Sequence, residues 1–182
     1  MRSLIDRLAD AKIGATCNFY RDGDGAAERR ARLERYLEER ADAPWLLVGE
    51  APGYRGARIS GIPFTSERQL TGHGPAEASA TIVHRVLAEL GLEAQVLLWN
   101  VVPTHPGTSV SNRRPTRGEI EQGLVYAREL SAGRRVVAVG RLAAAALEAP
   151  YVRHPSRGGA VEFRRGLLQC ALGGRLVRRF SV

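Results

Sequence analysis

Apolar positions follow two patterns that alternate along the chain. Short continuous runs predict buried strands at 44–49, 94–102 and 134–140, with a brief fourth strand at 151–156. Apolar residues at helical spacing predict helices between and around these strands, at 1–14, 26–41, 75–90, 116–132, 141–149 and 159–174. The sequence therefore predicts strands and helices in alternation.

Local signals support two of the helices. In 75–90, an apolar stripe ends at Gly91, a residue that commonly terminates helices. In 116–132, Thr116 and Glu119 have the spacing of a capping box, in which each residue bonds the backbone N–H of the other.

This alternation, with strands that are apolar throughout, indicates an α/β fold with a parallel sheet covered on both faces. The 182 residues suit a single domain, 1–182, in which residues 1–40 form a helical N-terminal extension. No run approaches the roughly 18 apolar residues that cross a bilayer, so we expect no membrane association.

Polar turns follow three of the predicted strands. Residues 49–53, Gly-Glu-Ala-Pro-Gly, follow the first strand, Asn100 to His105 close the second, and His154-Pro155-Ser156 end the fourth. The carboxyl ends of parallel strands lie along one edge of a sheet, where ligands bind. We therefore expect these turns to meet at one site.

Glu50 and Phe64 are candidates in the first part of this site. Glycine and Pro-Gly fix the backbone around Glu50 and let a substrate approach the main chain. A turn-stabilising carboxylate is the simpler interpretation. Phe64 follows a Gly-Ile-Pro turn that returns it beside Glu50, although core packing is the usual role of phenylalanine.

Asn100 and His154 are candidates in the second and fourth turns. Asn100 lies in the apolar run "LLWNVV", where a buried amide needs hydrogen-bond partners. It suits either a tie to a neighbouring loop or the polar edge of a nucleobase. His154 begins "HPSRGG", a loop able to lie against a phosphate backbone, although a lone histidine is usually structural.

Charge favours an anionic partner. The net charge is +8, and Lys12 is the only lysine among 27 basic residues. Arginine pairs with phosphate in a fork geometry, although a GC-rich genome also raises arginine content.

Two cysteines, Cys17 and Cys170, give no disulfide framework, so we expect a reducing cytoplasm. The histidines and cysteines have no metal-ligand spacing, and we expect no metal site.

Together these stretches resemble the uracil-DNA glycosylase superfamily over roughly residues 45–168. "GEAPG" with "GIPF" resembles its first motif, "NVVP" followed by "NRRPTRGEI" the segment after its second strand, and "HPSRGG" its histidine loop. The pattern is most similar to the bacterial family 4 and 5 enzymes. It implies a three-layer α/β/α sandwich with a central four-stranded parallel sheet.

The resemblance also implies a role for each residue. Gly49, Ala51, Pro52, Gly53 and Phe64 would bind the substrate, with Phe64 stacking on a flipped base. Asn100 would read the polar edge of the base, His154 would donate to uracil O2, and Glu50 would stand beside the sugar and its attacking water. The DNA contacts would be Arg113, Arg114, Ser156 and Arg157.

The sequence departs from the family at several positions. Family 4 enzymes hold an iron–sulfur cluster on four cysteines, and this chain has two, so we expect no cofactor. In the best-known branch of the superfamily, Ala51 is replaced by aspartate, and Gly53 by a tyrosine that blocks thymine.

The main hypothesis is a monomeric, cytoplasmic DNA-repair glycosylase that removes uracil, and other deaminated bases, from single- or double-stranded DNA. A catalytically inactive DNA- or lesion-binding protein on the same scaffold is the alternative. A hydrolase acting on free nucleosides is a third.

Overall fold

Four short strands form one parallel sheet in a computed structural model that describes residues 3–179, with side chains up to residue 173. The strand order is β2-β1-β3-β4. The strands are β1 (Trp45–Gly49), β2 (Val96–Asn100), β3 (Arg135–Val139) and β4 (Tyr151–Val152). The register pairs Gly49 with Asn100, so the last residues of β1 and β2 lie side by side. The predicted four-stranded parallel sheet is confirmed.

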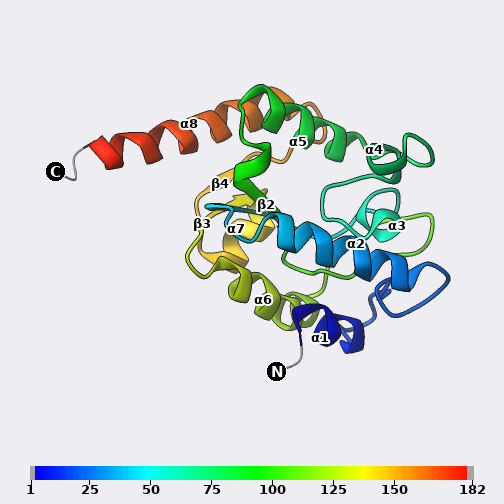
Figure 1. Ribbon diagram of the computed structural model, residues 1–182. Coiled ribbons are helices and arrows are strands. Elements are labelled where there is room, and N and C mark those ends of the chain that lie inside the picture. The colour runs from blue at the N-terminus through cyan, green and yellow to red at the C-terminus, as the bar shows by residue number, and fades with distance from the viewer. Residues whose placement is uncertain (1–2, 180–182) are drawn as a thin grey trace.

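Helices cover both faces of this sheet. In Figure 1, α5 (Ala78–Glu89) and α8 (Ala160–Arg179) lie on one side, and α6 (Arg117–Ser131) with α7 (Arg141–Leu147) on the other. The layers follow from the strand order, because right-handed crossovers that run in opposite directions along a sheet cover opposite faces. The α/β class and the layered arrangement are as predicted.

The N-terminal residues pack onto the same core. Leu8 in α1 (Leu4–Asp10) and Leu33 in α2 (Ala26–Glu39) are fully buried. The Leu98 N–H on the edge strand β2 donates to the Tyr36 hydroxyl of α2 over 2.7 Å. This bond satisfies a strand-edge donor that would otherwise be free. The predicted extension 1–40 is therefore docked on the sheet.

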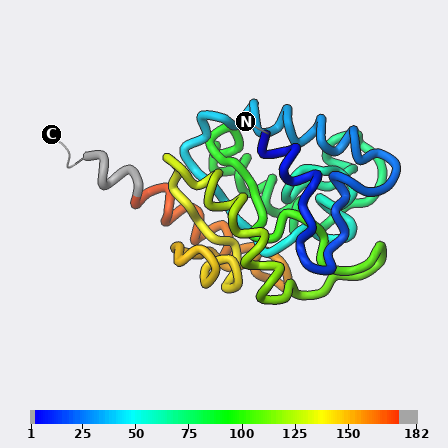
Figure 2. Tube along the Cα trace, turned by 90° about the horizontal axis from the view of Figure 1, so that it is seen from below, coloured from blue at the N-terminus to red at the C-terminus, as the bar shows by residue number. Residues whose placement is uncertain are grey.

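Some elements differ from the prediction in length or were not predicted. Helices α3 (Ala57–Ser60) and α4 (Glu67–Thr71) lie in stretches with no predicted element. The 3₁₀ turn η1 (Glu93–Gln95) takes the first residues of the predicted strand 94–102, so β2 begins only at Val96. β4 has two residues, fewer than the predicted 151–156, because the chain turns at His154-Pro155. Helix α8 is longer than 159–174 and extends away from the body of the molecule in Figure 1. Figure 2 shows the coloured part of this helix leaving the molecule on the same side.

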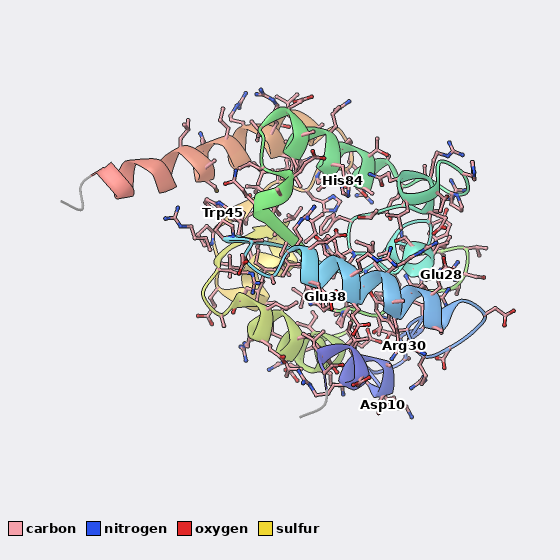
Figure 3. All side chains as sticks on the ribbon, viewed as in Figure 1. Asp10, Glu28, Arg30, Glu38, Trp45 and His84 are labelled. Atoms are coloured by element: carbon pink, nitrogen blue, oxygen red, sulfur yellow. The ribbon has the colours of Figure 1, made fainter. Side chains whose placement is uncertain are left out.

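The core lies between the sheet and its helices. Its largest fully buried side chain is Trp99 of β2, and the central strands contribute Leu46, Leu47 and Val137. Charged side chains such as Glu28 and Glu38 lie on the outside, whereas His84 projects from α5 toward the interior (Figure 3). Among the described residues, no helix has the length and apolar character that a membrane span requires.

A buried carboxylate, that of Glu119, joins three segments of the chain: the loop at Ala15, the loop at Arg113 and the start of α6. Glu119 of α6 forms the predicted capping box with Thr116. Its oxygens also accept two hydrogen bonds from the Arg113 guanidinium, at 2.8 and 2.6 Å, and one from the Ala15 N–H. The Arg113 guanidinium, the first of several hydrogen-bond donors, holds the pKa of Glu119 at about 2.

Replacing Glu119 by alanine is expected to cost about 2 kcal/mol of unfolding free energy at pH 7, because a hydrogen-bonded charge is lost. The folded-state pKa is depressed, so this stabilisation is present above the unfolded value near 4.5 and is lost as the pH falls toward about 2. Urea unfolding of both proteins at several pH values measures it. A stability difference that does not narrow between pH 4.5 and pH 2 would contradict the assignment.

Candidate active site

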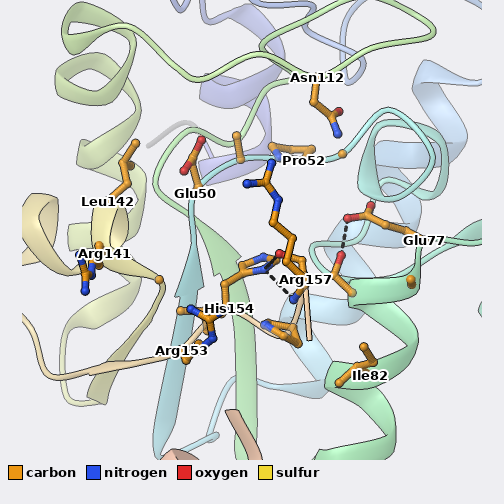
Figure 4. Close-up of a pocket in the computed structure, with 18 of the residues that line it drawn as sticks. Glu50, Pro52, Glu77, Ile82, Asn112, Arg141, Leu142, Arg153, His154 and Arg157 are labelled. Carbon is orange, nitrogen blue, oxygen red and sulfur yellow. Dashed lines mark hydrogen bonds between the residues drawn. The ribbon is translucent and has the colours of Figure 1, made fainter. Parts of the chain in front are cut away.

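One cavity of about 890 Å³ opens at the carboxyl edge of the sheet. Nine of the twelve predicted site residues line it: Glu50, Ala51, Pro52, Gly53, Arg113, Arg114, His154, Ser156 and Arg157. Figure 4 shows Glu50, His154 and Arg157 around the same space, although their elements are far apart in the sequence. The segments that follow β1, β2 and β4 therefore meet at this cavity, but the segment after β2 lines it with Pro106 and residues 112–114 and not with the predicted turn 100–105.

Glu50 is the first residue after β1. Two hydrogen bonds continue the pairing of β1 with β2 beyond the strands, from the Val101 N–H to the Gly49 carbonyl and from the Val102 N–H to the Glu50 carbonyl. They fix the backbone that carries the carboxylate. Burial raises the pKa of Glu50, and the nearby Arg114 charge opposes that shift. Among the described residues the carboxylate makes no hydrogen bond or ion pair, so it is not a turn-stabilising group.

His154 lines the cavity, and one of its ring nitrogens, Nδ1, has partners within the described chain. The Ser156 N–H donates to Nδ1 over 3.2 Å, and the Ser156 hydroxyl lies 2.8 Å from the same atom. A backbone N–H can only donate, so Nδ1 accepts and the proton of the neutral ring is on Nε2. Burial, with the Arg153 charge, lowers the pKa of His154 and favours this neutral form. The residue is thus a neutral hydrogen-bond donor.

Gly49, Phe64 and Asn100 form a second group, which is not on the cavity wall. A Cβ on Gly49 would lie 2.2 Å from Cζ of Phe64 and 3.0 Å from Oδ1 of Asn100. The ring and the amide therefore both reach the backbone of Gly49, next to Glu50. Asn100 is 3% exposed, and its amide makes no hydrogen bond within the described chain. The interpretation of Asn100 as a tie to a loop is not supported.

Phe64 has a strained backbone. Its φ is +54°, a left-handed value that a bulky residue rarely adopts. Buried hydrogen bonds hold the next residue, Thr65: its carbonyl accepts from the Ser60 hydroxyl over 2.6 Å, and its hydroxyl lies 3.0 Å from Nε2 of His84. The ring also packs partly against the core, which is the usual role of phenylalanine.

The arginines predicted to contact DNA differ in whether they already form an ion pair within the protein. Arg113 is bound to Glu119 through both terminal nitrogens, which leaves it less available for a phosphate. Arg114 and Arg157 line the cavity and make no ion pair within the described part of the chain. Arg157 has a φ of +52° and extends across the space between Glu50 and Asn112 (Figure 4). Ser156 orients His154 through the contacts given above.

Two residues that contact the first turn, 49–53, or the residue after it were not among the predicted site residues. His105 is fully buried, and its Nδ1 lies 2.8 Å from the Pro52 carbonyl oxygen. Asn112 accepts a hydrogen bond from the Tyr54 N–H over 2.9 Å. The sequence places His105 in the turn after the second strand, but it gives no signal for a partner 53 positions away.

A comparison with protein-family models identifies residues 37–175 as a match to the uracil DNA glycosylase superfamily. The chain belongs to this superfamily. Among solved structures, the wild-type SMUG2 of Pedobacter heparinus is similar, with a TM-score of 0.66, 12% identity and 97% of each chain covered. At that identity the likeness is one of fold. No curated protein matches the chain.

A second carboxylate, Glu77, also lines the cavity of this superfamily member and was not predicted. A Cβ on Gly53 would lie 2.4 Å from Oε2 of Glu77, and one on Gly56 would lie 1.9 Å from it. Glu77 therefore occupies the space that side chains at these two glycines would take. Its Oε1 accepts a hydrogen bond from the Ser79 hydroxyl over 2.6 Å (Figure 4). The wall opposite Glu50 is thus acidic.

The thiols present do not fit the iron–sulfur cluster of family 4 enzymes. Such a cluster takes four thiolates, and the chain has two cysteines. Cys17 pairs through its backbone with His105, whereas Cys170 is in α8, beside the amino-terminal ends of the strands at Trp45 and Val96. Within the described residues, no group of three or more potential metal ligands occurs.

Replacing Gly49 by alanine is expected to destabilise the protein by about 1–3 kcal/mol, because the new methyl group overlaps the Phe64 ring. The matched control is Gly118→Ala at an exposed position of α6, where a Cβ meets no atom within 4 Å. That variant is expected to gain about 0.5–1 kcal/mol from helix propensity. Urea unfolding compares them, and a Gly49→Ala protein as stable as wild type would contradict the packing described.

Proposed function

We propose that the protein hydrolyses the N-glycosidic bond of uracil in DNA after the nucleotide has been flipped out of the helix. One observation carries the proposal: a carboxylate without a partner, Glu50, and a neutral histidine donor, His154, line the same cavity. The volume, about 890 Å³, is within the range of sites that hold a nucleotide-sized ligand. Superfamily membership supports DNA as the substrate.

The two residues suit the charges that develop as the bond breaks. The departing base gains negative charge and the deoxyribose gains positive charge. The Nε2–H of His154 would donate to O2 of the leaving uracil, and Glu50 would stabilise the sugar cation and orient the attacking water. Each such preorganised group commonly contributes about 3–4 kcal/mol of transition-state stabilisation.

The group around Gly49 would receive the base. The Asn100 amide, which has no partner of its own, offers both a donor and an acceptor to the polar edge of uracil. Stacking on Phe64 would return about 1–3 kcal/mol. That gain offsets part of the few kcal/mol needed to extrude a nucleotide, a cost that is lowest for a mispaired base such as uracil opposite guanine.

The arginines at the cavity mouth would hold the DNA backbone. Arg114 and Arg157 are the main candidates for phosphate contacts, because their guanidinium groups are not engaged in ion pairs. Arg113 would contribute less while it is bound to Glu119. Binding through such contacts weakens as salt is raised.

The alternative of a DNA-binding protein without catalysis has one specific observation in its favour. Ala51, the third residue of the first motif, presents a methyl group to the cavity. Only Glu50 then supplies a carboxylate from that motif. Salt-sensitive binding of uracil-containing DNA without base release would favour this alternative, and turnover of free deoxyuridine would favour a nucleoside hydrolase.

Wild-type protein is expected to release uracil from single- and double-stranded oligonucleotides, detected as alkali-sensitive abasic sites. Glu50→Gln and His154→Ala are each expected to lower the single-turnover rate by about 100-fold to 1000-fold. Matched controls are Glu34→Gln and His73→Ala, both at exposed positions away from the cavity, with unchanged rates expected. The absence of base release by wild type at stoichiometric enzyme would overturn the proposal.

The rate is expected to depend on pH through Glu50. Its pKa is raised above 4.5, and the carboxylate is the active form, so the rate falls as the pH drops through that raised value. His154, with a pKa below 6.5, stays neutral at neutral pH. A single-turnover profile should therefore be flat near pH 7 and well below its maximum at pH 4.5. The residual activity of Glu50→Gln should lack this acid limb. An unchanged limb in that variant would count against the assignment.

A further inference from the structure

Buried hydroxyl groups close the loop that carries Phe64. The Ser60 hydroxyl donates to the Thr65 carbonyl over 2.6 Å, and the Thr65 hydroxyl donates to the Pro63 carbonyl over 3.2 Å. The side chains of Ser60 and Thr65 belong to buried residues, so water does not compete for these bonds. Residues 60–65, here called the 60–65 loop, are therefore bonded to one another across Phe64.

A histidine outside the 60–65 loop bonds to it. Nε2 of His84, which projects from α5 toward the interior (Figure 3), lies 3.0 Å from the Thr65 hydroxyl oxygen. A hydroxyl has one proton, and that of Thr65 is donated to Pro63, so its oxygen accepts from the His84 Nε2–H. Val86, two positions further along α5, is buried in the core. His84 thus ties the loop to a helix that is fixed on the sheet.

The protonation of His84 is consistent with this bond. Burial lowers the pKa of His84, and the Arg40 charge acts in the same direction. The Glu93 charge and a hydrogen bond with the Phe64 backbone oppose the shift. The ring is therefore neutral near pH 7, with its single N–H directed at Thr65. It contacts both the residue that carries the aromatic ring and the residue after it.

A tie at this point matters because the backbone of Phe64 is strained. A left-handed φ of +54° at a bulky residue persists only where the surrounding structure holds it. The Phe64 ring lies against the bare backbone of Gly49. The Tyr20 hydroxyl supports the loop at Gly61, which is at the other end from Phe64. His84 acts at the end where the ring has to be placed.

We propose that His84 is a positioning residue: through Thr65 it holds the Phe64 ring where the flipped base is expected to stack. This inference rests on the proposed function of the cavity. His84 is not among the residues that line the cavity, so it acts through Phe64 and does not touch the substrate. A misplacement of about 1 Å by a change outside the reacting groups can cost about 100-fold in rate.

The first test measures single-turnover uracil release from a single-stranded oligonucleotide at saturating enzyme. His84→Ala is expected to lower the rate about tenfold, because the 60–65 loop loses its tie to α5. His84→Gln, whose amide N–H can replace the Nε2–H, is expected to keep the rate within about twofold of wild type. His84→Leu fills the space without a donor and should behave like His84→Ala. A wild-type rate for His84→Leu would overturn the proposal, because packing alone would then place the ring.

A double-mutant cycle with Phe64→Ala separates positioning from a general loss of stability. If His84 acts through the ring, His84→Ala lowers the rate no further once the ring has been removed. Val86→Ala is the matched control, since Val86 is buried on the same helix and does not line the cavity. Any loss that this control causes should be the same with and without the Phe64 ring. Additive losses for His84→Ala and Phe64→Ala would refute the proposal and leave the proposed function intact.

A second measurement does not require turnover. In protein with labelled phenylalanine, the nuclear Overhauser effect between the Phe64 ring protons and the Gly49 α-protons reports their contact. His84→Ala is expected to weaken this signal several-fold, whereas His84→Gln and Val86→Ala should keep it. If no variant releases uracil, the proposed function fails, while this signal still decides whether His84 positions the ring. Equal signals from wild type and His84→Ala would count decisively against it.

Discussion

The site depends on the close approach of two side chains to the bare backbone of Gly49. Parallel pairing places Gly49 beside Asn100, and the Gly-Ile-Pro turn brings the Phe64 ring against the backbone of Gly49. A side chain at position 49 would separate the ring from the amide. Because Glu50 is the next residue, the geometry of this contact also sets where the carboxylate enters the cavity. Because Gly49 has no side chain, Phe64 and Asn100, the residues proposed to bind the base, lie next to Glu50, the residue proposed for the chemistry.

Much of the remaining structure keeps that contact in place. The Tyr20 hydroxyl, from the N-terminal part of the chain, donates to the Gly61 carbonyl over 2.8 Å and supports the turn that leads to Phe64. His105 supports Pro52 from the other side. These buried polar groups are satisfied by partners distant in the sequence, and they stabilise a backbone that is strained at Phe64. The N-terminal segment between α1 and α2 is therefore part of the support of the site.

The sequence predicted the sheet and the meeting of its turns, because apolar periodicity and the direction of parallel strands determine both. It did not predict α3 and α4, which are helices of four and five residues held by their surroundings. Three features depend on tertiary contacts that leave no local signal: the tautomer of His154, the position of Glu77 over Gly53, and the ion pair of Arg113. The sequence thus predicted nine candidate residues that line the cavity, whereas the partners of these residues required the structure.

In the proposed mechanism one site holds both the base and the sugar: the cavity lined by Glu50 and His154, together with Phe64 and Asn100, which adjoin it at Gly49. The most direct measurement is a crystal structure of the protein with an oligonucleotide containing 2′-fluoro-deoxyuridine. We expect an extruded uracil stacked on Phe64, with its polar edge at the Asn100 amide. Its O2 should lie within hydrogen-bond distance of Nε2 of His154, and the sugar should lie beside Glu50. A uracil bound elsewhere, or left in the helix with Phe64 still closed over Gly49, would contradict it.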